Sequence, residues 1–134
     1  MLELAKMFGK GKEKSKASKE TMRNLTGLEQ ICGSDREAYE ALSPVMFLDP
    51  RKVDVSMKEA VDNAKKADKE KDVSRARMWY EVAGGLAIYE GNTKKVMEYY
   101  GEAERVTDEK YLILNDPEKA VAKAQEYYKQ YLSS

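Results

Sequence analysis

Pairs of carboxylates one helical turn apart are the residues in this sequence best suited to chemistry. Glu98 and Glu102 form one pair, and Asp68 and Asp72 form another. Residues four apart share one face of a helix, so each pair has the spacing that a metal-binding carboxylate set uses. The di-iron bundles that use such carboxylates also need a Glu-x-x-His partner, and the chain contains no histidine. Each pair therefore indicates a solvated charged face, and the sequence predicts no metal site.

The absence of histidine also removes the commonest general base and the commonest metal ligand. Gly9-Lys-Gly-Lys12 lacks the spacing and the following Ser or Thr of a phosphate-binding loop. Gly84 and Gly85 lie inside a helical pattern, where they favour close helix packing over nucleotide binding. We therefore expect a protein that is not an enzyme and has no cofactor.

The elements around these residues are predicted to be helices. The 134-residue chain has 24 Lys and Arg against 24 Asp and Glu, 36% charged residues, three Pro and eight Gly. Ala, Glu and Lys dominate the segments with apolar periodicity, which favours helix over strand. The sequence predicts an all-α protein, and its zero net charge argues against a dedicated nucleic-acid binder.

Charge is unevenly distributed along the chain. Residues 1–23 carry seven Lys or Arg and three Glu, so their net charge of +4 is balanced by −4 in the remainder. Residues 9–20 have one apolar side chain, an Ala, which cannot offset the entropy of ordering. We expect a flexible basic segment over residues 1–17 and a single α-helical domain over residues 18–134. Residues 1–8 fit a short amphipathic turn that lies on an anionic membrane or docks elsewhere, with a frayed terminus as the alternative.

Cysteine usage and hydropathy predict the compartment. Cys32 is the only cysteine and cannot form an internal disulfide, which indicates a reducing setting. No run approaches the ~18 apolar residues that span a bilayer, and residues 1–8 lack the basic leader and longer apolar core of a secretion signal. We expect a soluble, cytoplasmic protein.

Helix boundaries in the first half follow from glycine and capping residues. Gly33 follows apolar residues at helical spacing and stands where a left-handed cap ends a helix. Ser34 and Glu37 have the spacing of a capping box, as do Ser56 and Glu59. Each of these two pairs predicts the start of a helix.

The second half carries similar boundaries. Gly91 predicts the end of a helix over residues 74–90, and Thr93 is positioned to cap the next helix. Asp116 and Pro117 predict the start of the last helix, as N-cap and first helical residue. The intervening run Tyr111–Leu114 fits either a short helix or a continuation of the preceding one.

Apolar faces predict which helices are neighbours. The helix after Ser56 presents mostly alanine, which lets another helix approach closely. Residues 74–90 are apolar on two sides, which predicts a central helix. Its two stripes are Ala76, Trp79, Ala83 and Leu86, and Met78, Val82, Gly85 and Tyr89. The expected inner faces of the last two helices are Val96, Tyr99, Tyr100, Ala103 and Val106, and Ala120, Val121, Ala124, Tyr128, Tyr131 and Leu132.

The sequence predicts that one helix pair is repeated, because a shift of 36 residues superposes Ala60, Ala64 and Ala67 on Val96, Tyr100 and Ala103. Residues 74–108 then resemble a tetratricopeptide repeat (TPR), with Trp79, Val82, Ala83 and Leu86 on first-helix positions and Val96 and Tyr100 on second-helix positions. Ala replaces the first-helix Gly, and Asp108 stands where Pro is expected. Over residues 56–108 the resemblance implies antiparallel helical hairpins stacked as a TPR-like bundle of about five or six helices.

The same span also resembles a microtubule-interacting and trafficking domain, which is a three-helix bundle. The matching residues are Ala60, Ala64, Ala67, Asp68, Tyr80, Ala83, Glu98, Tyr99, Tyr100, Ala103 and Glu104. Members of that family hold short peptides in grooves between helices. Both resemblances therefore imply a protein that binds another protein.

A candidate binding face remains on the central helix once both stripes are buried. Tyr80, Tyr99 and Tyr127 lie beside the apolar stripes of their helices, so each is either a groove-lining aromatic or the edge of the core. The predicted partner-binding residues are Arg77, Tyr80, Glu81, Gly84, Ile88 and Tyr99.

These observations predict a non-catalytic interaction module or adaptor that binds a partner peptide or helix in a groove lined by the 74–90 helix. An accessory nucleic-acid-binding or membrane-surface-binding protein that acts through the basic residues 1–17 is the alternative. A homodimer joined through an open apolar patch is a third hypothesis. A helical bundle whose spacing reflects packing alone is the simplest interpretation.

Overall fold

The computed structural model describes residues 27–132, and every regular element in that range is helical. Residues 27–32 are helical. The elements that follow are α3 (Arg36–Leu42), the 3-10 turn η1 (Pro50–Lys52), α4 (Met57–Lys69), α5 (Val73–Glu90), α6 (Thr93–Thr107), the 3-10 turn η2 (Leu112–Asn115) and α7 (Pro117–Tyr131). The all-α prediction is confirmed. The predicted basic segment 1–17 lies outside the described residues.

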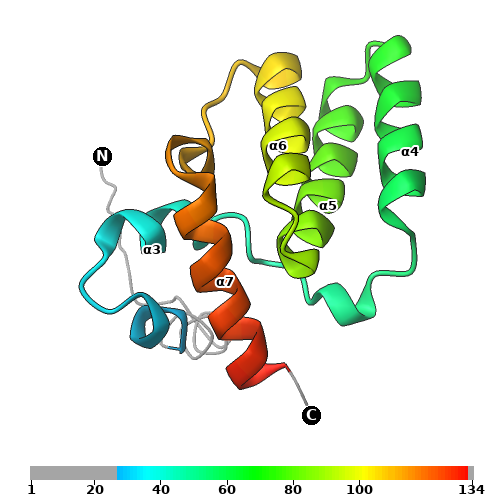
Figure 1. Cartoon of the computed structure of the whole chain (residues 1–134). Coiled ribbons are helices and arrows are strands. Elements are labelled where there is room, and N and C mark those ends of the chain that lie inside the picture. Colours follow the sequence, from blue (N-terminus) through cyan, green and yellow to red (C-terminus); the bar gives the residue numbers. More distant parts are fainter. Residues whose placement is uncertain (1–26, 133–134) are drawn as a thin grey trace, which may run out of the picture.

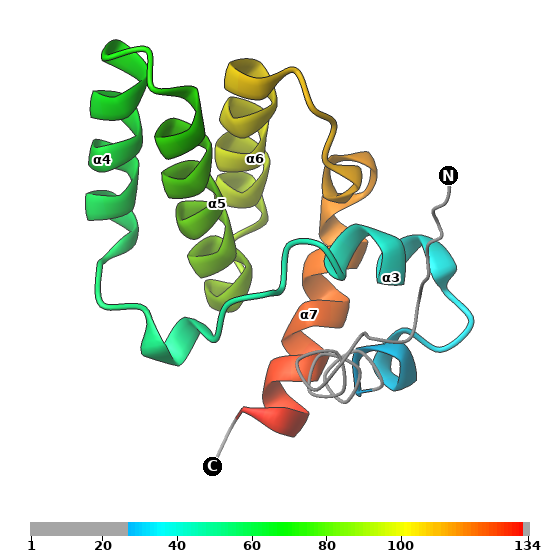
Figure 2. The ribbon, with the colours of Figure 1, turned by 180° about the vertical axis from the view of Figure 1, so that it is seen from behind.

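Helices α4, α5 and α6 form one layer, and α3 and α7 form a second group beside it. Figure 1 shows α4, α5 and α6 side by side, with short turns that make neighbours antiparallel. Helix α7 packs against α5 and α6 and also contacts α3, and the view from behind in Figure 2 shows α3 beside α7. Helix α5 is therefore central, as its two apolar sides predicted.

Several predicted boundaries are confirmed. Ser56 and Glu59 form a complete capping box at the start of α4. Gly33 and Gly91 have positive φ values of 60° and 75°, which favour glycine at a helix end. At α7, the Asp116 side chain accepts a hydrogen bond from a backbone amide and Pro117 is the first helical residue.

Two predicted caps are wrong by one residue. Asp35, and not Ser34, caps α3, because its Oδ1 accepts a hydrogen bond from the Ala38 amide at 3.1 Å. Asn92, and not Thr93, caps α6 through the Lys95 amide at 3.1 Å. In both cases Asp or Asn, whose side-chain oxygen is at least as good a cap as a hydroxyl, occupies the adjacent position.

The small residues of the three-helix layer allow close packing. Ala60, Ala64 and Ala67 of α4 are buried, as predicted from its alanine face. Gly84 of α5 is covered by the ring of Tyr100, and a Cβ at Gly84 would lie only 2.6 Å from Cζ of that ring. Close approach of α5 and α6 therefore depends on a missing side chain.

The predicted stripes of α5 are partly wrong. The buried residues of α5 are Ala76, Tyr80, Ala83, Gly84, Ala87 and Ile88. Met78 is 46% exposed and Tyr89 is 40% exposed, although both were assigned to the second stripe. The reason is that Gly84, which carries little hydrophobicity of its own, receives the large ring of Tyr100 from α6.

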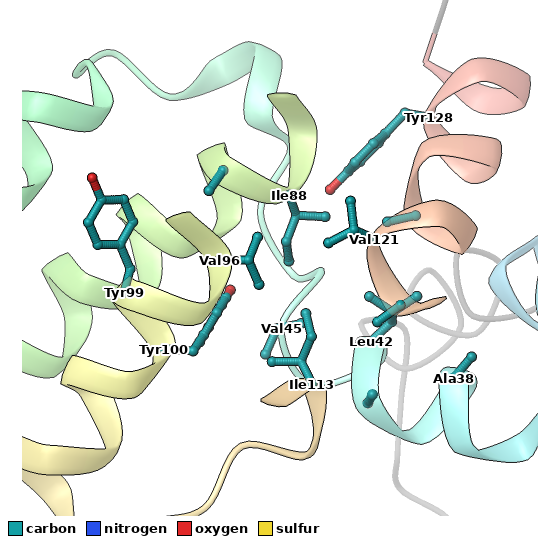
Figure 3. Packing of buried hydrophobic residues seen from close by; sticks show 14 of the residues in the cluster. Ala38, Leu42, Val45, Ile88, Val96, Tyr99, Tyr100, Ile113, Val121 and Tyr128 are labelled. Carbon is teal, nitrogen blue, oxygen red and sulfur yellow. The ribbon is translucent and has the colours of Figure 1, made fainter. Parts of the chain in front are cut away.

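The segment between α6 and α7 connects the three-helix layer to α3 and α7. Element η2 contacts α3, α6 and α7, and its Ile113 is fully buried. Figure 3 shows Ile113 and Val45 in the junction where Ile88 and Val96 face Val121 of α7. The run Tyr111–Leu114 thus forms a short turn, and Ile113 anchors it in the core.

Candidate interaction surface

Arg77 and Glu81 form a polar network with the segment after α6. Arg77 pairs with Glu81 at 3.3 Å and with Glu109 at 3.4 Å, and the Tyr111 hydroxyl donates a hydrogen bond to Glu81 Oε2 at 2.5 Å. The Tyr111 amide also donates to Glu104 Oε2 at 2.8 Å. Burial and the hydrogen bond to Glu81 raise the pKa of Tyr111. These contacts hold the chain after α6 against α5.

The other four predicted partner-binding residues lie inside the protein. Tyr80, Gly84, Ile88 and Tyr99 are all buried. Tyr80 packs with Ala64 and Ala103 in a small cluster of its own. The predicted groove face therefore needs correction, because α5 packs against its neighbours through that face.

Tyr100 combines complete burial with an unpaired hydroxyl. Its ring has no exposed surface, and its hydroxyl oxygen has no hydrogen-bond partner among residues 27–132. Burial raises the pKa of Tyr100 well above its usual value, and the charge of Glu81 adds to the effect. The folded protein therefore requires this phenol to stay neutral.

We expect the free energy of unfolding to fall as pH rises above about 10, the pKa of an unfolded tyrosine. Below that pH both states hold the Tyr100 proton, whereas above it only the folded state does. One such group contributes a slope of about 1 kcal/mol per pH unit. Urea unfolding across this range should show a shallower loss for Tyr100→Phe than for the wild type. An unchanged slope in the variant would contradict the assignment.

Two hollows on the described surface adjoin each other at the C-terminal half of α7. One, of about 540 Å³, lies against the end of α5, and the other, of about 270 Å³, lies against the loop before η1. They share two lining residues, Tyr128 and Leu132. We call this pair of hollows the α7 groove. Its large apolar lining residues are Met46, Phe47, Leu48, Tyr89, Tyr127, Tyr128 and Leu132.

Aromatic rings form much of the α7 groove. Tyr128 meets Tyr89 edge to face with centroids 5.1 Å apart, and it meets Tyr127 at 6.0 Å. Phe47 is 59% exposed, and Leu48 is also exposed. Large apolar side chains with a few placed polar groups are typical of protein-binding hot spots.

Hydrogen bonds fix the walls of the α7 groove. Gln125 Nε2 donates to the carbonyl oxygens of Ile88 at 2.7 Å and Tyr89 at 2.9 Å, which ties α7 to the end of α5. Arg51 pairs with Asp49 at 3.0 Å and donates to the carbonyl oxygen of Leu132 at 3.2 Å. The surface is thus pre-organised, which lowers the entropic cost of binding.

Most of the α7 groove was not predicted from the sequence. Tyr127 was among the predicted groove candidates, whereas Phe47, Leu48 and Tyr89 were not. The adjacent apolar residues Met46, Phe47 and Leu48 lie in the loop between α3 and η1, because α3 ends at Leu42. An apolar run in a loop is the feature that indicates such a surface.

A smaller hollow of about 220 Å³ lies between α3, η2 and α7. Its floor contains Ala38, Ala41 and Ala120, and its rim is charged. Lys119 on that rim pairs with Asp35 at 3.1 Å and Glu37 at 3.5 Å. Because this lysine is already paired within the chain, the hollow is a weaker candidate than the α7 groove.

One carboxylate of each pair named first, Asp68 and Glu102, serves as an ion-pair partner. Arg105 binds Asp68 at 2.6 Å and Glu102 at 2.7 Å, which joins α6 to α4. These two carboxylates raise the pKa of Arg105. Within residues 27–132, no group of three or more His, Cys, Asp or Glu residues is placed to hold a metal ion. Over the same residues, no helix is long and apolar enough to cross a membrane.

Comparisons of the chain with protein families, with curated proteins and with solved structures found no match. The TPR-like and microtubule-interacting and trafficking-like resemblances therefore stay predictions.

Proposed function

We propose that this protein is a non-catalytic interaction module that holds a peptide or helix of a partner protein in the α7 groove. The observation that supports this function is the pair of adjoining hollows around Tyr128 and Leu132, with Phe47, Leu48 and Tyr89 exposed at their edges. The 74–90 helix remains one wall of the proposed binding site, because Tyr89 lies on α5. Arg77 and Glu81 are no longer part of the proposed contact.

A helical or extended peptide suits the shape and chemistry of the α7 groove. Aromatic rings supply contact area at a low entropic cost, and the nearby Glu126 and Lys129 supply polar partners. Cys32 is buried and unpaired, which fits a reducing compartment, and we place the module in the cytoplasm.

Substitution of one exposed groove residue tests this function. The full-length protein, immobilised, is incubated with native cell extract at about 0.1 M and 0.5 M salt, beside Phe47→Glu and the matched control Val73→Glu. Val73 is 50% exposed and lies 16 residues before Tyr89 on α5, about 24 Å away. We expect Phe47→Glu to reduce retention of the bound proteins about tenfold, and Val73→Glu to have no effect.

Two outcomes would overturn the groove assignment. One is retention of the same proteins by Phe47→Glu, with circular dichroism confirming that both variants are folded. The other is recovery of only nucleic acid or anionic lipid, at low salt and by all three proteins. That second result would favour the alternative function through the basic residues 1–17, since such binding weakens steeply with salt.

A further inference from the structure

The described chain begins beside the α7 groove. A Cβ at Gly27 would lie 3.1 Å from the ring of Tyr131 and 3.4 Å from the ring of Tyr127, which lines the groove. The Tyr131 hydroxyl also donates a hydrogen bond to Gln30 at 3.2 Å. The described part of the chain therefore begins at the wall of the groove.

Residues 1–8 have apolar side chains that suit the aromatic and aliphatic lining residues of the α7 groove. Met1, Leu4, Ala5 and Phe8 have the i, i+3, i+4, i+7 spacing of one helix face. This is the arrangement of anchors by which amphipathic helices enter hydrophobic grooves. The only charged residues in the octet are Glu3 and Lys6.

We infer that residues 1–8 of the same chain occupy the α7 groove as an internal ligand and compete there with the partner. This inference rests on the proposed function, because the octet can regulate partner binding only if the partner uses the same groove. The groove is then covered when the partner is absent, and partner binding displaces the octet.

Tether length and charge favour this occupant over a free peptide. Eighteen residues, 9–26, join the octet to the groove wall, and a tether of that order gives an effective concentration near 1 mM. Residues 1–23 carry a net charge of +4 and the rest of the chain −4, so the two parts attract each other at moderate salt. An octet with only millimolar intrinsic affinity would fill the groove about half of the time.

Paramagnetic relaxation in the full-length protein tests the inference. A nitroxide on Gly9→Cys is attached to ¹⁵N-labelled protein, and the mass is checked for a single label because Cys32 is buried. We expect strong broadening of the amides of Phe47, Leu48 and residues 125–132. The amides near Lys71, at the opposite end of α5, should keep their intensity. Leu4→Glu/Phe8→Glu should remove the broadening.

The same octet variant links the inference to function. If the octet fills the groove half of the time, Leu4→Glu/Phe8→Glu should raise partner capture about twofold. Absence of broadening overturns the inference, and the proposed function stands if Phe47→Glu still abolishes capture. Broadening with capture that does not depend on Phe47 supports octet docking and overturns the proposed function.

An experiment on mixed samples shows whether the octet in the groove comes from the same chain or from a second copy of the protein. Unlabelled protein that carries the nitroxide is mixed with ¹⁵N-labelled protein that has no nitroxide. Docking within one chain predicts no broadening in the mixture. Broadening there would show that the octet comes from another molecule and would overturn the intramolecular inference.

Discussion

Gly84→Ala is expected to lower the free energy of unfolding by about 2 kcal/mol. A new Cβ would lie 2.6 Å from Cζ and 2.9 Å from Cδ2 of Tyr100, closer than real carbon contacts allow. Tyr100 is fully buried, so its ring has no solvent-facing space into which to move. Overpacking of this kind costs roughly 1–3 kcal/mol or more, which exceeds the gain of up to ~1 kcal/mol from alanine in a helix. Urea unfolding followed by circular dichroism measures the difference.

The adjacent glycine is the matched control for this prediction. A Cβ at Gly85 meets no atom within 4 Å, so Gly85→Ala should raise stability by up to ~1 kcal/mol through helix propensity alone. Tyr100→Leu should make Gly84→Ala less costly, because the smaller side chain removes the clash. If the two alanine substitutions had equal effects, the contact between Gly84 and Tyr100 would not limit the approach of α6 to α5.

Ile113→Ala is expected to destabilise the protein by about 3 kcal/mol. Ile113 is fully buried on a turn of only four residues, and that turn contacts α3, α6 and α7. Loss of its side chain leaves a cavity at the junction, and Ile113 is the only buried residue of this turn. Thermal or urea unfolding of the variant measures the loss.

Leu112, which precedes Ile113 in the chain, provides the matched control. Leu112 is 47% exposed, so Leu112→Ala should cost less than about 1 kcal/mol. The comparison also tests the closed arrangement of the chain. If the α3 and α7 group and the three-helix layer unfolded together in the wild type but separately in Ile113→Ala, the turn would be the element that couples them. A small effect of Ile113→Ala would indicate that the junction is held elsewhere.

Local sequence determined most helix boundaries, because a cap depends on residues within one turn. The capping box of Ser56 and Glu59, the positive φ of Gly91 and the Asp116–Pro117 start all follow from neighbouring residues. The caps assigned to Ser34 and Thr93 were one residue off, since in each case an adjacent Asp or Asn caps the helix instead. The alanine face of α4 was also predicted from the sequence, because burial of one helix face imposes a period of 3.6 residues on the apolar positions.

Only the tertiary structure decided which sides of α5 are buried and where a partner fits. Nearly all of α5 is apolar or small, so periodicity did not separate the face of Gly84 and Ile88 from that of Met78 and Tyr89. A glycine contributes almost no hydrophobicity, and its role appeared only when Tyr100, from another helix, was placed against it. The α7 groove likewise combines a loop, the end of α5 and the end of α7. Segments so distant in sequence share no local pattern, and their contact depends on the packing of the whole chain.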